Sequence, residues 1–280
     1  MYRKFCDIPY TTLGEDGPAL DIYLPEVGEG PFPVVVYFHG GSYTKGDKSE
    51  EQRLAYALPM LKGGYAVAAL NYSLAPKARF PRPIVEGKAA VRFLRAHAAE
   101  FMLDPDHFIA CGASAGGYFA AMLATTMGAF EYDDLSLGYP NEPEDVQAAV
   151  IFFGTMNFAS LDAQFKERGV VRAHPPVASP DSPEAQLFGV TIGENPELYQ
   201  KASPVQLVNS DTPPMILFHG TSDAVIPFEQ SVEMAEALAT AIGRDRVALH
   251  IVSGAGHSDV RFTEYSYFGE IFAFLAQNLY

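Results

Sequence analysis

Short apolar runs recur along the chain and are separated by segments with helical periodicity. The runs are rich in β-branched and aromatic residues and apolar on both faces, as in strands covered by helices on either side, and they occupy residues 33–40, 65–72, 108–112, 148–154, 215–220 and 247–252. Apolar residues also return at the spacing of a helix face over residues 90–101, 232–242 and 268–275. This alternation predicts an α/β fold with a mostly parallel central sheet and helices on both faces.

Two parts of the chain depart from this alternation. The segments YTTLG (residues 10–14) and ALDIYLPE (residues 19–26) predict a short antiparallel pair of strands at one edge of the sheet. Residues 155–214 contain no strong strand pattern, many prolines and one amphipathic stretch at 161–169. A structureless loop of that length is uncommon inside a compact domain, so we expect this segment to hold its own helices and to form a cap. The whole chain, residues 1–280, is then a single domain with a cap insertion.

Composition and charge narrow the classes of partner. Nearly half of the 280 residues are hydrophobic, which suffices for one large core, and the formal net charge is −15. Such an acidic surface repels phosphate backbones, so we expect no nucleic-acid partner. No apolar stretch approaches the roughly 20 residues that span a bilayer, and we expect no membrane partner. The sequence is compatible with a monomer or a homo-oligomer.

The two cysteines and the N-terminus bear on the compartment. Cys6 and Cys111 lack the spacing and the neighbours of metal ligands, so we expect no metal site and no disulfide. The N-terminal residues MYRKFCDIPY lack the apolar core of a secretory signal. We therefore expect a cytoplasmic protein, although a secreted chain that had lost its signal would look the same.

The stretch GASAG, residues 112–116, follows a predicted strand and precedes an alanine-rich segment. It fits the pattern G-x-S-x-G, in which a serine occupies a strained turn between a strand and a helix. The Ser114 hydroxyl would then be exposed above the sheet, and the first N–H groups of the helix would face any negative charge formed beside it. Ser114 is therefore a candidate nucleophile. The alternative is a glycine-rich turn that only packs a helix onto the sheet.

A serine is a poor nucleophile unless a base removes its proton. In this type of turn and sheet the partners follow in the order Ser, Asp or Glu, then His, each in the loop after a later strand. Asp223 stands just after the run at 215–220, and His257 stands in a glycine-flanked loop just after the run at 247–252. The ordered set predicts a triad of Ser114, His257 and Asp223. His219, at the end of a strand, is expected to pack near the site without titrating.

The segment HGGS, residues 39–42, supplies a fourth element. Acyl transfer places negative charge on a carbonyl oxygen, and backbone N–H groups held in place stabilise that charge most effectively. Glycine lacks Cβ, so this backbone can approach a substrate closely. We predict an oxyanion hole formed by the N–H groups of Gly41, Ser42 and Ala115. A phosphate-binding loop is the alternative, but the segment lacks both the G-x-G-x-x-G spacing and a Walker lysine.

Together, HGGS, NYSLAP, GASAG, SDAVIP and GAGHS resemble the α/β-hydrolase fold, in particular bacterial esterases related to hormone-sensitive lipase. The likeness is strongest to small carbohydrate-type esterases, such as the rumen bifunctional feruloyl and acetyl-xylan enzymes, and it covers nearly the whole chain. It implies the same triad, an oxyanion hole from the HGGS loop and Ala115, and no metal or organic cofactor. The chain departs from the family pattern at Ser42, where HGGG has its third glycine, and at Tyr43, where tryptophan is common. Ser42 fits the same role because only its N–H is required, whereas the difference at Tyr43 falls at the pocket wall and bears on the substrate rather than on the chemistry.

We therefore interpret the chain as a serine carboxylesterase acting on small-molecule esters with short acyl groups, such as acetyl or hydroxycinnamoyl esters of carbohydrates. Bulky residues of the cap are expected to close the pocket over the serine, among them Phe158, Phe165, Leu187, Phe188 and Tyr199. Two alternatives stay open: an amide hydrolase of the arylformamidase or peptidase type with the same triad, and a non-catalytic binding protein on a hydrolase scaffold.

Overall fold

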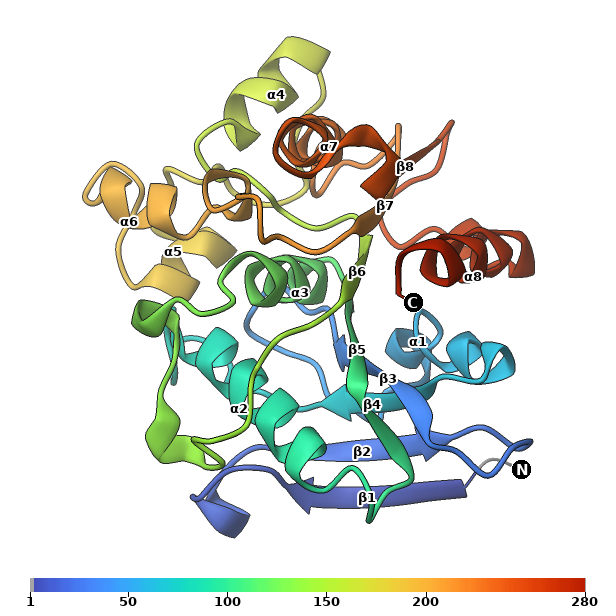
Figure 1. Cartoon of the computed structure of the whole chain (residues 1–280). Helices are drawn as coiled ribbons and strands as arrows, with labels where there is room; N and C mark the ends of the chain where they lie inside the picture. Colours follow the sequence, from blue (N-terminus) through green and yellow to red (C-terminus); the bar gives the residue numbers. More distant parts are fainter. Residues whose placement is uncertain (1–2, 280) are drawn as a thin grey trace.

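The computed structural model describes residues 3–279, and they form one eight-stranded sheet with the order β1-β2-β4-β3-β5-β6-β7-β8 (Figure 1). Strands β1, β2 and β4 pair antiparallel, and every pair from β4 to β8 is parallel. The strands are β1 (Arg3–Pro9), β2 (Ala19–Leu24), β3 (Phe32–Phe38), β4 (Ala66–Leu70), β5 (Leu103–Ala113), β6 (Ala148–Phe152), β7 (Met215–Gly220) and β8 (Val247–Val252).

Helices follow most of the parallel strands. They are α1 (Glu51–Leu54), α2 (Arg82–Ala96), α3 (Ala115–Thr125), α4 (Leu161–Arg168), α5 (Pro183–Phe188), α6 (Pro196–Lys201), α7 (Glu229–Ile242) and α8 (Tyr265–Asn278). Short 3₁₀ turns lie at Gly14–Asp16, Leu58–Gly63, Phe130–Tyr132, Leu135–Leu137, Pro204–Gln206, Arg244–Arg246 and Val260–Thr263.

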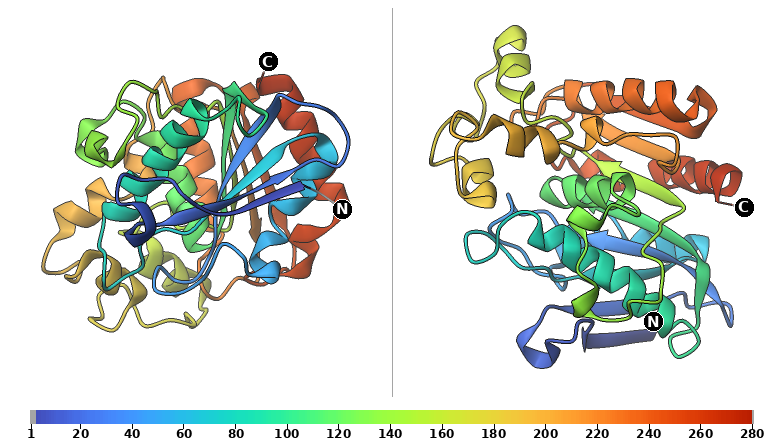
Figure 2. Two further views of the ribbon diagram at one scale, coloured as in Figure 1. Left: turned by 90° about the horizontal axis from the view of Figure 1, so that it is seen from below. Right: turned by 60° about the vertical axis from the view of Figure 1, so that its left-hand side comes forward.

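The sheet separates two hydrophobic cores. Successive residues of a strand point to opposite faces, so Val34 and Val36 of β3 join one core, whereas Val35 and Tyr37 join the other. Helices α2, α3 and α7 supply residues to the first core, and α1 and α8 supply residues to the second. Figure 2 shows these two layers on opposite sides of the twisted sheet. The predicted parallel sheet with helices on both faces is confirmed.

The antiparallel edge is present, but its first strand was predicted in the wrong place. Strand β1 occupies Arg3–Pro9, and the predicted segment YTTLG forms the turn that follows it. The outermost strand of a sheet is covered on few sides, and most side chains of β1 are exposed. Its sequence RKFCDIP therefore shows no continuous apolar pattern. Cys6 in β1 and Cys111 in β5 are free thiols, the first exposed and the second buried.

The segment between β6 and β7, residues 155–214, contains no strand and holds α4, α5 and α6. Figure 1 shows α5 and α6 beyond the end of α3 and α4 beside α7, all three away from the central strands. Two of the helices, α5 and α6, begin with sequence signals typical of N-termini: Ser182 accepts a hydrogen bond from Ala185 N, and Asn195 accepts one from Leu198 N. Five residues of this segment line a cleft that Ser114 also lines: Thr155, Arg172, His174, Pro183 and Glu184.

Candidate active site

Ser114 occupies the turn between β5 and α3 with φ of 57° and ψ of −122°. A positive φ is uncommon for a residue with Cβ and marks a strained turn. The flanking glycines permit it, because a Cβ at Gly112 would collide with the carbonyl oxygen of Gly116, and a Cβ at Gly116 with that of Phe38. Ser114 N also donates to Phe152 O at 2.9 Å, which fixes the turn to β6.

The loops after β7 and β8 bring two further side chains to this turn. Nε2 of His257 lies 2.9 Å from Oγ of Ser114, and its Nδ1 lies 2.7 Å from Oδ2 of Asp223. The side chain of Asp223 is fully buried, whereas that of His257 is 16% exposed. With the proton on Nδ1, Nε2 offers its lone pair to the serine hydroxyl, which is the arrangement that a general base requires. The structure thus brings the three predicted residues together.

Asp223 is held as an anion by its surroundings. Its Oδ1 accepts hydrogen bonds from the N–H groups of Val225 at 2.8 Å and Ile226 at 2.9 Å. Burial by itself raises the pKa of Asp223, but the hydrogen bonds from His219 and His257 outweigh it and hold the pKa well below its ordinary value. The carboxylate therefore stays charged and can orient and stabilise a protonated imidazole.

His219 has a contact that the sequence analysis did not anticipate. This buried histidine places Nε2 3.0 Å from Ile226 O and 3.4 Å from Oδ2 of Asp223, and Nδ1 2.8 Å from Ser231 Oγ. A carbonyl oxygen only accepts, so Nε2 carries the proton and Nδ1 accepts from the Ser231 hydroxyl. His219 is thus a second donor toward Asp223, anchored on α7. Its position at the end of β7, four residues before Asp223, was the available signal in the sequence.

The loop after β3 places backbone N–H groups beside the serine. Gly41, Ser42 and Ala115 border the hollows that Ser114 lines, and their N–H groups have no protein acceptor within the described chain. Ser42 has φ of 51° and Gly41 has φ of 140°, which turn this backbone away from an extended path. These three N–H groups are the predicted oxyanion donors, and they lie near one another.

Hydrogen bonds to the carbonyl groups of the same loop keep it in shape. The hydroxyl of Tyr72 donates to His39 O at 2.6 Å, and Nη1 of Arg53 donates to Gly40 O at 2.6 Å. The N–H groups of Thr44 and Lys45 both donate to Gly41 O at 3.1 Å. The carbonyl oxygens of the loop are therefore paired with protein donors, while its N–H groups at Gly41 and Ser42 are left for a ligand.

Ser114 lies where two hollows meet. One is an open pocket of about 560 Å³ bordered by Ser114 and His257, whose polar lining includes Lys45, Glu50, Gln52 and Arg53. The other is a narrow cleft of about 10 Å³ that Ser114 shares with Tyr43, Ala115, Thr155, Arg172, His174 and Glu184. A space of that size holds about one water-sized group. Tyr43 therefore lies at the wall of a pocket, as its position after HGGS indicated.

The bulky cap residues do not close the pocket, so that prediction was wrong. Phe158, Phe165, Leu187, Phe188 and Tyr199 are buried and line neither hollow. Phe158 contacts the rings of Tyr118, Phe188 and Tyr199, with centroids 5.1 to 5.9 Å apart. Apolar side chains of an irregular segment gain more by joining the core than by facing an open pocket. Four polar residues of the segment, Thr155, Arg172, His174 and Glu184, line the narrow cleft instead.

Residues 3–279 contain neither a candidate metal site nor a membrane-spanning helix. In that range no group of three or more His, Cys, Asp or Glu side chains is placed to hold a metal ion. Nor does any helix there have the length and apolar character needed to cross a membrane.

Comparisons with known proteins identify the family of the chain. Residues 20–238 match the BD-FAE family. Esterase LipC of Mycobacterium tuberculosis is 30% identical over 260 residues, which are 91% of this chain and 60% of LipC. Isoprenylcysteine alpha-carbonyl methylesterase ICME of Arabidopsis thaliana is 28% identical over 249 residues, 86% of this chain and 54% of that protein. The chain thus spans about half to three fifths of these curated relatives.

Solved structures agree over nearly the whole chain. A truncated form of a carbohydrate esterase from gut microbiota superposes with a TM-score of 0.86 at 26% identity and covers 99% of this chain and 96% of that one. A bifunctional GH43-CE protein from Bacteroides eggerthii gives a TM-score of 0.85 at 28% identity, over 99% of this chain and 35% of that one. The chain is therefore an α/β-hydrolase that belongs to the BD-FAE family, and its relatives include named esterases.

Proposed function

We propose that the chain is a serine carboxylesterase that hydrolyses short acyl esters, in particular acetyl esters of carbohydrates. The observation that carries the proposal is the hydrogen-bonded series from Ser114 through His257 to Asp223 at the floor of an open pocket. The names of the relatives support the class of reaction, because LipC is called an esterase and the gut-microbiota structure a carbohydrate esterase.

The proposed reaction has two halves, acylation of Ser114 and hydrolysis of the acyl-enzyme, and the same residues act in both. Ser114 Oγ attacks the ester carbonyl while His257 Nε2 takes its proton, and His257 then gives that proton to the leaving alcohol. Water attacks the acyl-enzyme with His257 again as base, and Ser114 recovers its proton when the acid leaves. Asp223 keeps the imidazole in the required tautomer and stabilises its charged form. The N–H groups of Gly41, Ser42 and Ala115 would stabilise the oxyanion in both halves.

The two hollows suggest where each half of the ester binds. His257 must reach the leaving oxygen, so the alcohol belongs in the open pocket that His257 borders. The acyl group then points into the narrow cleft beside Ala115. Charged and amide side chains in the open pocket suit the hydroxyl groups of a sugar, and the small cleft suits an acetyl group better than a hydroxycinnamoyl group.

Substitution of the nucleophile tests the mechanism. We expect Ser114→Ala to lower kcat for 4-nitrophenyl acetate by about 10⁴ or more, because the acyl-enzyme can no longer form. Circular dichroism should show an unchanged fold, and the exposed Ser210→Ala variant serves as the matched control. Near-native turnover by folded Ser114→Ala protein would contradict the proposed mechanism.

A series of 4-nitrophenyl esters with acyl chains of increasing length tests the substrate class. Filling a closed space beyond its capacity costs about 1–3 kcal/mol by analogy with an overpacked core. We therefore expect kcat/KM to be highest for the shortest acyl groups, acetyl first, and to fall at least about tenfold by octanoyl. A rise through octanoyl would reject the short-acyl assignment while leaving the triad intact. Equal cleavage of 4-nitroacetanilide would favour an amide hydrolase.

A further inference from the structure

The narrow cleft beside Ser114 is bordered by a buried carboxylate. Glu184, in the first turn of α5, is 2% exposed. Its Oε1 accepts a hydrogen bond from Nη2 of Arg172 at 2.6 Å, whereas its Oε2 has no hydrogen-bond partner in the described part of the chain. Both residues line the cleft together with Ser114. A carboxyl oxygen in the lining of the cleft is therefore left without a partner.

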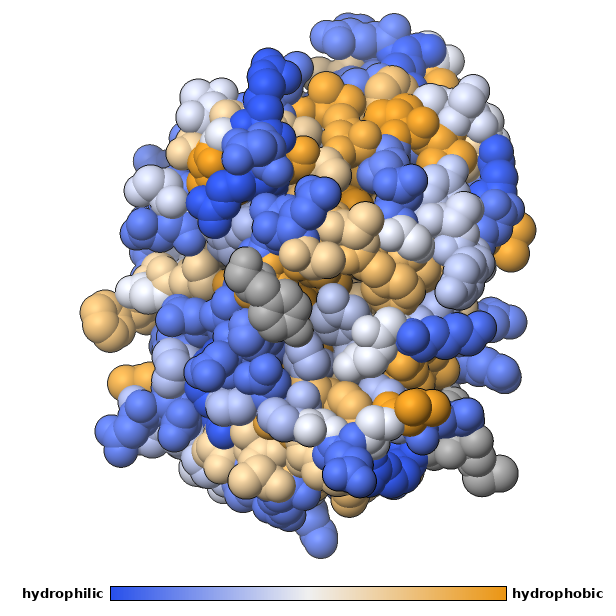
Figure 3. Space-filling model, turned by 45° about the vertical axis from the view of Figure 1, so that its right-hand side comes forward, coloured by the Kyte–Doolittle hydropathy of each residue, from blue (hydrophilic) through white to orange (hydrophobic). Residues whose placement is uncertain are grey.

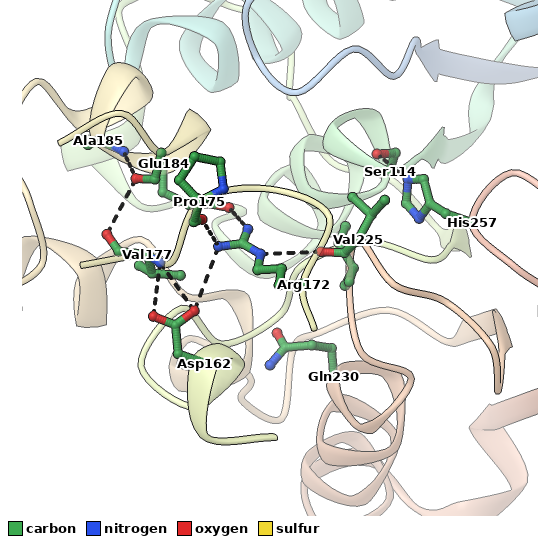
Figure 4. Close-up of polar contacts among 12 residues, drawn as sticks. Ser114, Asp162, Arg172, Pro175, Val177, Glu184, Ala185, Val225, Gln230 and His257 are labelled. Atoms are coloured by element: carbon green, nitrogen blue, oxygen red, sulfur yellow. Dashed lines mark hydrogen bonds and ion pairs between the residues drawn. The ribbon is translucent and has the colours of Figure 1, made fainter. Parts of the chain in front are cut away.

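Arg172 holds this carboxylate in place. Its Nη1 donates to Pro175 O at 2.8 Å, its Nε donates to Val225 O at 3.5 Å, and Asp162 lies 3.7 Å away. Figure 4 shows the guanidinium between Asp162 and Val225, with Ser114 and His257 on the side of Val225. Because Arg172 is fixed from several directions, Glu184 cannot easily rotate to pair its second oxygen with the same guanidinium.

Buried polar atoms without partners are rare in this chain, and two of them share this cleft. Within residues 3–279 the buried, unpaired side-chain atoms are Thr11 Oγ1, Tyr118 OH, Thr155 Oγ1, Glu184 Oε2 and Glu229 Oε2. Thr155 and Glu184 line the cleft, and the other three residues line neither hollow. Buried polar groups are normally paired, and exceptions need an explanation such as an absent ligand group. The side chain of Thr155 also interacts with that of Tyr43 in the same cleft, so Glu184 Oε2 is the exception that points to a polar acyl group.

We propose that the cleft selects 2-hydroxyacyl esters, such as glycolyl esters, because a hydroxyl next to the ester carbonyl would hydrogen-bond to Glu184 Oε2. This inference rests on the proposed esterase function and names the acyl group that the same site prefers.

The charges of the cleft favour a neutral donor. Arg172 already neutralises Glu184, so an acyl group with an ammonium is not required, and one with a carboxylate would face a like charge. Burial raises the pKa of Glu184, and the nearby Arg172 opposes that rise. A hydroxyl fits either protonation state, because it can donate to the carboxylate or accept from the acid. Thr155 Oγ1 can pair with the same hydroxyl.

A matched pair of esters tests the proposal. Phenyl glycolate and phenyl propionate have the same number of heavy atoms and the same leaving group, and phenol release gives kcat/KM for both. For each protein we take the ratio of kcat/KM for the glycolate to kcat/KM for the propionate. Dividing the wild-type ratio by the Glu184→Met ratio removes the difference in intrinsic reactivity between the two esters. We expect this quotient to be about tenfold or more, because a hydrogen bond to a charged group is lost.

Further variants keep the test decisive. Glu184→Gln retains a polar group at the cleft and should give an intermediate ratio, and Thr155→Val should lower the ratio more modestly. Glu229→Met removes another carboxylate with a buried unpaired oxygen, outside the cleft, and should keep the wild-type ratio. If Glu184→Met does not fold, as judged by circular dichroism, Glu184→Gln and Thr155→Val supply the comparison.

The possible failures are distinguishable. Wild-type protein that cleaves phenyl acetate and gives the same ratio as the Glu184 variants, within about twofold, would overturn this inference, and the cleft would then hold water only. Wild-type protein that cleaves none of the three esters would contradict the proposed function itself.

Discussion

At the scale of single residues, Asp223 determines which nitrogen of His257 faces the serine. An amide at position 223 would keep the shape of the side chain, but its NH₂ group would favour the imidazole tautomer with the proton on Nε2. We therefore expect Asp223→Asn to lower kcat for acetyl esters by about 10⁴. The exposed Asp211→Asn variant is the control. A folded Asp223→Asn protein with kcat within tenfold of the wild type would remove Asp223 from the proposed mechanism.

The acid dependence of the rate tests His257. A general base must be unprotonated, and a free imidazole titrates at about 6.5. Asp223, whose pKa is held below its ordinary value against the effect of burial, remains charged throughout the neutral range. We expect kcat/KM to fall in mildly acidic buffer with a slope of one and to level off at neutral to alkaline pH. A flat profile down to about pH 4 would point to a carboxylate base instead.

The sequence allowed the polar residues that directly follow a strand to be located, but not those of the irregular segment between β6 and β7. Ser114, Asp223 and His257 stand directly after apolar runs, and the ends of parallel strands meet at one edge, so their order was informative. Arg172 and Glu184 lie in a segment without periodicity, where spacing says nothing of which side chains converge. For the same reason the bulky residue Phe188 could not be assigned to core or pocket from the sequence.

At the scale of elements, the loop after β3 depends on Asp47. Its carboxylate accepts hydrogen bonds from Ser49 N at 2.8 Å and Ser49 Oγ at 2.6 Å, and from Asn71 Nδ2 at 2.8 Å at the end of β4. Partial burial works against ionisation, but these hydrogen bonds lower the pKa of Asp47 from 3.8 to about 2. The charged form thus ties the loop that carries Gly41 and Ser42 to the neighbouring strand.

This shift predicts how the loop contributes to stability. A carboxyl group with a lowered folded pKa stabilises the protein above its unfolded pKa and loses that contribution as the pH falls through the folded value. Urea denaturation should therefore show Asp47→Asn to be less stable than the wild type at pH 7 and at pH 5. The difference should shrink between about pH 4 and pH 2. A difference that does not change with pH would mean that packing, not charge, explains the effect.

The elements were predictable to different degrees. Strands β3 to β8 carry apolar residues on both faces because helices cover both sides, and all six matched predicted runs. Strand β5 begins at Leu103, before its predicted start, because Asp104, Pro105 and Asp106 interrupt the apolar pattern. Helix α2 ends at Ala96, so Ala98 and Phe101 continue its apolar spacing only as buried turn residues. The apolar pattern of a sequence indicates directly which side chains are buried. It indicates the backbone conformation only where the buried residues also belong to a regular helix or strand.

At the scale of the whole molecule, the alternation of strand and helix predicted the parallel sheet but not the strand order. The position of β4 between β2 and β3 is a property of how the chain crosses over, and periodicity carries no information on it. The resemblance of five short motifs to α/β-hydrolases indicated the fold, and the strand order itself was not predicted. The fold and the strand ends were thus accessible from sequence, whereas the shape of the acyl cleft required the structure.

The net charge of the molecule leads to a last prediction. The chain carries a formal charge of −15, and Figure 3 shows hydrophilic residues spread over much of one face. A negative electrostatic field around the protein lowers the local concentration of anionic substrates. Added salt weakens this field, because the Debye length falls from about 30 Å at 0.01 M to about 10 Å at 0.1 M. We expect kcat/KM for 4-acetoxybenzoate to rise about twofold or more between 10 and 200 mM NaCl.

The neutral ester 4-acetoxybenzamide is the matched control and should respond little to salt. The open pocket itself contains Lys45 and Arg53, which attract anions, but Glu50 lies 2.6 Å from Arg53 Nε and offsets one of them. The long-range field should therefore dominate the approach of the substrate. A rate for 4-acetoxybenzoate that falls with salt would show instead that the cations at the pocket outweigh the charge of the molecule as a whole.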